Sequence, residues 1–470
     1  MELDTINSTA EVSWFERAVL ATLRVVPGRR TTAFSERTRL AVRGSAWSIA
    51  GYGGSQLLRL ATQLILARTL LGPEAFGLVA LVVVFVNGLD LLSDLGVGTD
   101  VIRHPRGDDP AFMNTAFSIQ AIRGLILWAI AAIFAYPFAS FYHQPLVRSM
   151  ILVAAISVGL RGFASTSVWT MTRQVQVARL TGLTLGSDFV GFLVALLWAA
   201  FSPTAWALVL GRVASSAAFA IASHLMADHP FSLEWDASAA RDIFVFGSGM
   251  FLASATYFLS GEAERLVIGK FTTPAELGCF SLALGLSWGP SRALQQAISQ
   301  VFFPLIARAA HEDRLAASRD YRKVKVLLLG ASSVLVCGFI LLGPFAVHVL
   351  LGPKYGSAGW MLQLLGFRAS LELFSSTTAA MLFAVGFSSY PAAGNIAKLL
   401  FLSVGLAIAF GRFGLREAMW VLTLAQLANY LPQLWGLGRR FRPALRAEIA
   451  GFLVFLGVTG AAVMIHRMLG

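Results

Sequence analysis

The sequence predicts an all-α integral membrane protein with about 12–14 transmembrane helices, arranged as two six-helix lobes around a central cavity. Of the 470 residues, 56% are hydrophobic and only 13% are charged, whereas soluble domains carry roughly 25% charged residues. Long apolar windows follow one another with short connections, so no ectodomain of roughly 50 residues separates them. A stretch near the start of the chain also recurs about 200 residues later, as in transporters built from repeats.

Apolar windows long enough to cross a bilayer, about 20 residues each, predict the spanning helices in order. The windows cover residues 44–67, 75–100, 113–141, 147–169, 180–201, 204–225, 243–269, 277–306, 324–350, 358–385, 390–410, 417–436 and 447–468. They divide the chain into a basic tail (1–43), an N-lobe (44–226), a linker (227–242), a C-lobe (243–436) and a basic loop with an extra helix (437–470). An odd number of spans places the two termini on opposite sides of the membrane.

Most of the 37 Lys and Arg residues fall in segments that this scheme puts on one side, which is therefore expected to be cytoplasmic. These segments are the N-terminal tail, the stretch from Arg308 to Lys325, and the loop with Arg439, Arg440, Arg442 and Arg446. Topology thus accounts for much of the net charge of +12, and nucleic-acid binding is not needed to explain it. Residues 12–26 have the apolar spacing of a surface-lying amphipathic helix, with a disordered tail as the alternative.

Neither a disulfide nor a metal centre is expected, because Cys279 and Cys337 are the two cysteines and both lie in apolar runs. The N-terminus lacks a basic start followed by an apolar core, so a cleaved signal peptide is not expected. Tryptophans such as Trp47, Trp169 and Trp288 are expected to pack at interfaces or in the core, and stacking on sugars is the alternative.

The internal repeat relates residues 44–78 to residues 247–279. The two copies read GSAWSIAGYGGSQLLRLATQLILARTLLGPEAFG and GSGMFLASATYFLSGEAERLVIGKFTTPAELGCF. Pro73 matches Pro274, and Gly77 matches Gly278. Because six windows separate the copies, both halves enter the membrane in the same sense, and such parallel repeats leave a cavity between two lobes. Chance recurrence of apolar windows is the alternative.

Ionisable residues inside the spans are the candidate site, because a charge at the bilayer centre costs about 3 kcal/mol or more unless it faces a cavity or a partner. The acids are Asp90, Asp94, Asp188, Glu262, Glu264 and Glu372, and the more numerous bases are Arg59, Arg123, Arg161, Arg212, Arg265, Arg292, Arg368 and Lys398. A surplus of guanidinium suits an anion, since arginine offers planar bidentate donors to phosphate.

Spacing sorts these residues further. Gln56, Arg59 and Gln63 share one helical face, and Asn87, Asp90 and Asp94 form an acidic stripe on the next span. For two pairs, Glu262 with Arg265 and Arg368 with Glu372, the alternative to a role in the cavity is that the two opposite charges neutralise each other within their own helix. The arginines without a local acid are Arg123, Arg161 and Arg212, for which Asp188 is a candidate partner. Lys398 is expected to extend to the interface.

Two stretches, ARTLLGPEAFGLVALVVVFVNGLDLLSDLGVGTDVIR and GEAERLVIGKFTTPAELGCFSLA, resemble the polysaccharide-export branch of the superfamily that includes multidrug exporters and lipid-linked oligosaccharide flippases. The resemblance implies a flippase for undecaprenyl-pyrophosphate-linked oligosaccharide in the bacterial inner membrane. It also implies that Arg59, Arg265 and Arg292 hold the pyrophosphate. The chain departs from the family in its odd thirteenth span and its tail of 43 residues.

We therefore expect a transporter with an alternating-access mechanism, and neither an enzyme nor a protein with a resident cofactor. Arg123, Gln56 and Gln63 are expected to complete the cavity, and H⁺ or Na⁺ coupling is expected at an acid among Asp90, Asp94, Asp188, Glu264 and Glu372. The expected partners are the lipid-linked glycan, membrane lipids, and the polymerase and glycosyltransferases of the same pathway. The alternatives are a drug or metabolite exporter of the same fold, a membrane polymerase or ligase, and a scaffold.

Overall fold

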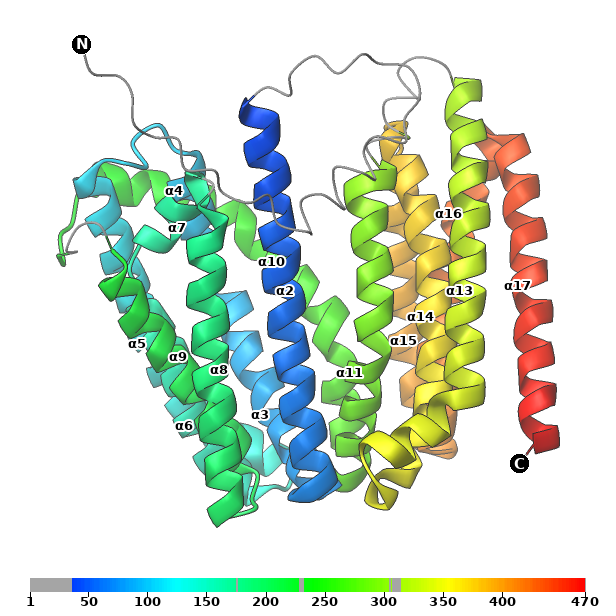
Figure 1. Ribbon diagram of the computed structural model, residues 1–470, viewed down its shortest axis with the longest axis horizontal. Helices are drawn as coiled ribbons and strands as arrows, with labels where there is room; N and C mark the ends of the chain where they lie inside the picture. The colour runs from blue at the N-terminus through cyan, green and yellow to red at the C-terminus, as the bar shows by residue number, and fades with distance from the viewer. Residues whose placement is uncertain (1–35, 175, 228–231, 304–305, 307–313, 470) are drawn as a thin grey trace, which may run out of the picture.

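The computed structural model describes residues 36–174, 176–227, 232–303, 306 and 314–469 (Figure 1). Within these ranges the chain is helical and contains no strand. The long helices are α2 (Glu36–Thr69), α3 (Pro73–Leu92), α5 (Pro110–Phe141), α6 (Pro145–Gly162), α8 (Val177–Phe201), α9 (Trp206–Leu225), α10 (Ala237–Phe271), α11 (Pro274–Ala297), α13 (Arg314–Leu350), α14 (Gly356–Ala384), α15 (Ser389–Arg412), α16 (Leu415–Arg440) and α17 (Arg442–Leu469). Short elements join them, namely α4 (Val97–Arg103), α7 (Ser167–Arg173), η1 (Ile298–Phe302) and η2 (Pro353–Tyr355).

Each apolar window of the sequence corresponds to one long helix, so the predicted all-α membrane fold is confirmed. The windows 75–100, 147–169 and 277–306 extend too far, because α3, α6 and α11 end before these windows do and short elements follow. Eight of these helices are long and apolar enough to cross a membrane by themselves, namely α3, α5, α6, α8, α9, α13, α15 and α17. The remaining long helices, α2, α10, α11, α14 and α16, carry more polar residues. The protein is a multi-pass membrane protein, and the predicted amphipathic helix at 12–26 lies outside the described residues.

Local sequence sets the ends of the helices. Pro110 and Pro274 occupy first turns, where their missing N–H groups would be unpaired in any case. Thr273 and Glu276 form a capping box at the start of α11. At its other end α3 stops at Leu92, with Ser93 as the C-cap, and Gly96 in a left-handed conformation with φ 60° precedes α4, so α3 does not continue to residue 100.

The long helices form two groups (Figure 1). The first contains α3, α5, α6, α8 and α9, with α2 packed along α8, and the second contains α11 and α13 to α17. Helix α11 packs on both α3 and α14, and α10 packs on α3 and α5 and also contacts α11 and α15, so these two helices join the groups. The largest buried core draws residues from both groups, including Leu66, Phe76, Phe280 and Tyr355. The assignment of the groups to repeated lobes stays a prediction.

Helices α3 and α11 cross at their first turns through a reciprocal contact, which we call the glycine crossing. A β-carbon at Gly77 would overlap the carbonyl oxygen of Pro274, and a β-carbon at Gly278 would overlap the carbonyl oxygen of Pro73. These are the four positions that match in the sequence repeat. A two-fold relation between the groups would produce such a reciprocal contact, and glycine permits it because it has no side chain.

Hydrogen bonds close the same end of the molecule. The Tyr355 hydroxyl donates to the Leu71 carbonyl oxygen at 3.0 Å, and Arg68 Nη1 donates to the His348 carbonyl oxygen at 2.8 Å. We call this end, at which α3 and α11 begin, the closed end. The chain enters α2 and leaves α16 at the opposite end (Figure 1).

The thirteenth long helix, α17, is attached to the second group by a buried polar cluster, which we call the Glu448 network. Lys325 Nζ on α13 lies 2.6 Å from Glu448 Oε1 on α17. The hydroxyl of Tyr321 donates to Glu448 Oε2 at 2.7 Å, that of Thr378 donates to Oε1 at 3.0 Å, and that of Tyr430 also donates to Oε1. The sequence analysis assigned Lys325 to a cytoplasmic segment, but the structure places this ion pair in the packed interior.

Candidate functional site

Two arginines from separate helices lie over one tryptophan, and a tyrosine links them to a third arginine. The guanidinium carbon of Arg265 on α10 lies 5.0 Å from the Trp288 ring centroid, and that of Arg292 on α11 lies 4.4 Å from it. The Tyr52 hydroxyl on α2 interacts electrostatically with Arg292 and Arg59. We call these five residues the arginine–tryptophan cluster. It brings together the three arginines that the sequence proposes for pyrophosphate.

The polar face of α2 is directed toward the cluster. Gln56 Nε2 donates to the Tyr52 hydroxyl at 2.9 Å, and Gln63 Oε1 lies beside Gly285 of α11, 3.6 Å from the site of a β-carbon there. Tyr52 and Arg59 are both exposed, so they are accessible to a ligand. The spacing of the polar residues along α2 predicts this shared face. The proximity of Gln63 to α11, by contrast, depends on how the helices pack.

The cluster keeps an excess of positive charge. Arg265 Nη1 pairs with Glu262 Oε2 at 2.6 Å, so that local pairing is confirmed, but its Nε is buried with no hydrogen-bond partner among the described residues. Arg212 on α9 donates to Asn87 Oδ1 at 3.1 Å and lies within electrostatic range of Arg59, Arg161 and the carboxylate of Asp90. Guanidinium groups therefore outnumber the carboxylates near the cluster, which favours an anionic ligand.

Arg123, expected in the cavity, is bound within the first helix group. Its Nη2 lies 2.8 Å from Asp90 Oδ1, and its Nε donates to the Ser93 carbonyl oxygen at 2.9 Å. Asp188, the candidate partner from the sequence, instead accepts from Ser215 at 3.3 Å. Asp94 lies beyond the end of α3 and accepts from the Gly96 amide at 2.9 Å. Within the predicted acidic stripe, Asp90 therefore binds Arg123, and Asp94 stabilises the turn that follows α3.

A second charged cluster joins α10 to α14. Arg368 Nη1 and Nη2 lie 2.5 and 2.7 Å from the two carboxylate oxygens of Glu264, and both side chains are buried. The local pairing of Arg368 with Glu372 that the sequence allowed is wrong, because the buried Glu264 offers a bidentate partner. Glu372 remains within electrostatic range of Arg368, as does Lys398. No metal-binding group of three His, Cys, Asp or Glu side chains occurs among the described residues.

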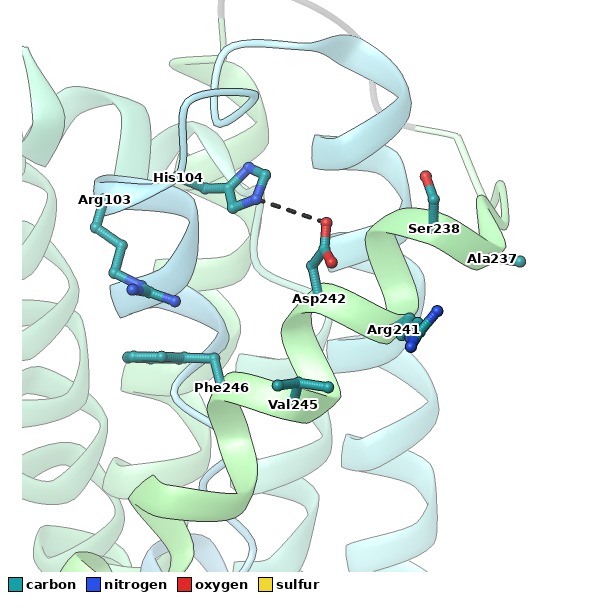
Figure 2. A pocket seen from close by; sticks show the side chains of 8 residues that line it. All are labelled: Arg103, His104, Ala237, Ser238, Arg241, Asp242, Val245 and Phe246. Carbon is teal, nitrogen blue, oxygen red and sulfur yellow. Dashed lines mark ion pairs between the residues drawn. The ribbon is translucent and has the colours of Figure 1, made fainter.

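At the end opposite the glycine crossing, α4 and the start of α10 enclose a pocket of about 900 Å³ (Figure 2). The guanidinium of Arg103 lies 3.9 Å above the Phe246 ring centroid. His104 Nε2 lies 3.6 Å from Asp242 Oδ2, and Arg241 also lines the pocket. Asp100 Oδ1 accepts from Arg103 at 3.0 Å. The two arginines of this pocket are therefore accompanied by two acids.

The segment that connects the two helix groups is bound to the first group directly before α10 begins. Arg106 Nη2 lies 2.9 Å from Asp236 Oδ2 and 2.9 Å from Asp109 Oδ2. Asn114 Nδ2 donates to Glu234 Oε2 at 3.0 Å. Hydrogen bonds from Arg106 and Ser238 hold the pKa of Asp236 well below its usual value. These contacts attach the start of α10 to the first group.

Known proteins are similar to this chain in both sequence and fold. Residues 65–359 match the family model described as polysaccharide biosynthesis protein. The chain belongs to this family. It is 23% identical over 351 residues to the succinoglycan biosynthesis transport protein ExoT of Rhizobium meliloti (strain 1021), covering 73% of this chain and 69% of ExoT. It is 22% identical over 357 residues to the amylovoran biosynthesis protein AmsL of Erwinia amylovora, covering 72% of this chain and 88% of AmsL.

Among solved structures the fold is similar to that of the lipid II flippase MurJ in an inward closed conformation. The TM-score is 0.65 at 12% sequence identity, and the match covers 90% of this chain and 98% of MurJ. The predicted polysaccharide family is thus confirmed, as is an all-α membrane fold similar to that of known transporters. The sequence did not single out Trp288 as a neighbour of two arginines. A signal for it lay in its spacing from Arg292, since residues four apart share a helical face.

Proposed function

We propose that the protein translocates an oligosaccharide linked to undecaprenyl pyrophosphate across the bacterial inner membrane, for surface-polysaccharide synthesis. The observation that carries the proposal is the arginine–tryptophan cluster, in which α2, α10 and α11 each supply an arginine. The names of ExoT and AmsL, together with the likeness to a lipid II flippase, support a glycan substrate carried on a lipid. In this proposal the protein moves the substrate without breaking or forming covalent bonds.

The cluster suits a pyrophosphate for three physical reasons. Guanidinium groups donate paired hydrogen bonds to phosphate oxygens and remain protonated at any physiological pH. Trp288 orients two of them over its ring, which reduces the conformational entropy lost on binding. The buried Nε of Arg265 offers a donor that lacks a partner among the described residues, and an anion would satisfy it.

Alternating access between the helix groups would move the head group. With the N-terminus in the cytoplasm, as the positive-inside pattern favours, the closed end faces the periplasm. Separation of the glycine crossing, with closure at the opposite end, would then present the cluster to the periplasm. The lipid tail would remain in the bilayer during this exchange.

The Glu264–Arg368 pair is our proposed coupling site for H⁺ or Na⁺. If the Glu264 carboxylate on α10 bound a cation in place of the Arg368 guanidinium, the ion pair that attaches α10 to α14 would be lost. Asp90, Asp94 and Asp188 are less suited to coupling, because each already accepts a hydrogen bond within its own helix group.

The decisive experiment combines Arg59→Ala and Arg292→Ala variants with lipid analysis of a strain that lacks the wild-type gene. We expect loss of the surface polymer and accumulation of lipid-linked oligosaccharide on the cytoplasmic side of the inner membrane, with normal amounts of the variant protein in the membrane. Arg148→Ala, near the closed end, is the matched control and should export normally.

Normal export by both cluster variants would overturn the site, and accumulation on the periplasmic side would indicate a polymerase or ligase. A change in drug sensitivity with normal polymer would indicate the exporter.

A further inference from the structure

The corner between α16 and α17 holds a small pocket on the side of the bundle away from the arginine–tryptophan cluster. It has a volume of about 330 Å³ and is lined by Leu434, Trp435, Gly438, Arg439, Leu445 and Arg446. Leu445 packs closely against Gly438, so the two helices meet at the floor of the pocket. Figure 1 shows α17 at one edge of the molecule.

The charge of this pocket is uniformly positive. Its two arginines face no carboxylate among the described lining residues. The nearest acid in the sequence, Glu448, is fully buried and already accepts from Lys325 and three hydroxyl groups. By contrast, the pocket between α4 and α10 in Figure 2 contains Asp242 beside its arginines. The α16–α17 corner is therefore the better anion site of the two.

The surroundings of the pocket are those of a membrane interface. The guanidinium carbon of Arg439 lies 4.0 Å from the Trp435 ring centroid, and the indole is 57% exposed. Leu431 and Leu453 are also exposed on the adjoining turns of α16 and α17. Tryptophan with arginine above an apolar surface is typical of the level at which lipid head groups lie.

We propose that this corner binds the phosphate group of an anionic phospholipid, such as phosphatidylglycerol. Arg439 and Arg446 donate to the phosphate oxygens, Trp435 holds Arg439 in position, and the acyl chains lie along Leu431 and Leu453. The inference is independent of the proposed transport function, since it concerns the membrane lipid around the protein. Pyrophosphate on an undecaprenyl chain has related chemistry, and the test below separates the two sources.

Lipid-dependent thermal protection of the purified full chain in a neutral detergent tests the site. Phosphatidylglycerol is expected to raise the unfolding temperature of the wild type, whereas phosphatidylcholine is not. The Arg439→Gln/Arg446→Gln variant should need about 25-fold more phosphatidylglycerol for half-maximal protection, because each of the two bases near a lipid surface contributes about a fivefold gain in affinity. The Arg439→Lys/Arg446→Lys variant should retain most of the protection, since the charge is kept.

Arg179→Gln/Arg322→Gln, which removes two exposed arginines elsewhere, is the control and should match the wild type. The exposed Arg446→Gln single variant serves if the double variant is unstable without lipid, and a severalfold loss is expected there too. Unchanged protection in the glutamine variants would overturn the proposal. Protection through these arginines by undecaprenyl pyrophosphate but not by phosphatidylglycerol would overturn the phospholipid assignment.

Discussion

Trp288 shows how one aromatic side chain organises several charges. The guanidinium groups of Arg265 and Arg292, which come from different helices, both lie over its ring. Such contacts contribute about 0.5–2 kcal/mol each, depending on how far the site is desolvated. The tryptophan therefore acts as a positioning residue for the arginines proposed to bind substrate.

Replacement of this tryptophan tests that role. Trp288→Leu is expected to lower affinity for undecaprenyl pyrophosphate at least about fivefold, because both arginines lose the ring that orients them. Trp288→Phe should have a smaller effect. Binding of labelled lipid to purified protein measures the change, and Trp198→Leu, at an exposed tryptophan of α8, is the control. Equal affinities for Trp288→Leu and the wild type would argue against a positioning role.

At the scale of elements, the attachment of α17 depends on the Glu448 network. Helix α17 packs on α13 and α16, and its buried carboxylate receives one ammonium and three hydroxyl donors. Lys325 and Glu448 are both nearly inaccessible. Loss of one partner leaves the other charge buried without compensation, which typically costs about 3–5 kcal/mol.

Glu448→Met and Lys325→Met should each destabilise the protein by about 3–5 kcal/mol for this reason. The double variant Lys325→Met/Glu448→Met should be less destabilised than the sum of its parts, because no charge remains buried. Thermal unfolding in detergent measures all three variants. Additive losses would show that the two side chains do not act as a pair.

The start of α10 is a second element held by charges, and here the pH dependence follows from the pKa of Asp236. Because Arg106 and Ser238 lower this pKa, the stabilisation is complete above the unfolded-state pKa of about 4 and is lost as the pH falls through the lower folded-state value. Hydrogen exchange at 237–243, corrected for intrinsic rates, should show constant protection from about pH 5 to 8. Asp236→Asn should reduce protection throughout that range, whereas Asp242→Asn, at the neighbouring pair with His104, should have a smaller effect.

At the scale of the whole molecule, the glycine crossing determines how closely the two helix groups approach. The backbone of α3 meets that of α11 at Gly77 and Gly278, and Tyr355 and Arg68 add hydrogen bonds at the same end. A methyl group at either glycine would force these helices apart because the opposing atom is a backbone oxygen.

Gly278→Ala is therefore expected to open the closed end. Spin labels at Leu146→Cys on α6 and Lys354→Cys in η2, with Cys279 and Cys337 replaced by alanine, would report the distance between the groups. The population at longer distance should increase in Gly278→Ala and in Gly77→Ala. Gly457→Ala on α17, where a β-carbon meets nothing within 4 Å, is the control. An unchanged distance distribution in both variants would show that the crossing does not limit closure.

The sequence by itself determined the helices and their order, because the apolar content and helical period that bury a span in lipid are local properties of about 20 residues. Charged residues within apolar windows stand out in the sequence, and the family resemblance singled out Arg59, Arg265 and Arg292 among them as candidates for the site. The Pro73 and Pro274 match likewise anticipated a relation between the halves.

Only the tertiary structure decided which charges meet. Arg123 binds Asp90, Arg368 binds Glu264, and Lys325 binds Glu448. Each of these partners lies on another helix, and the choice depends on where helices cross and how deeply each side chain is buried. Helical spacing predicts the face on which a residue lies, but contact across two faces is fixed by packing of the whole bundle, which no local period encodes.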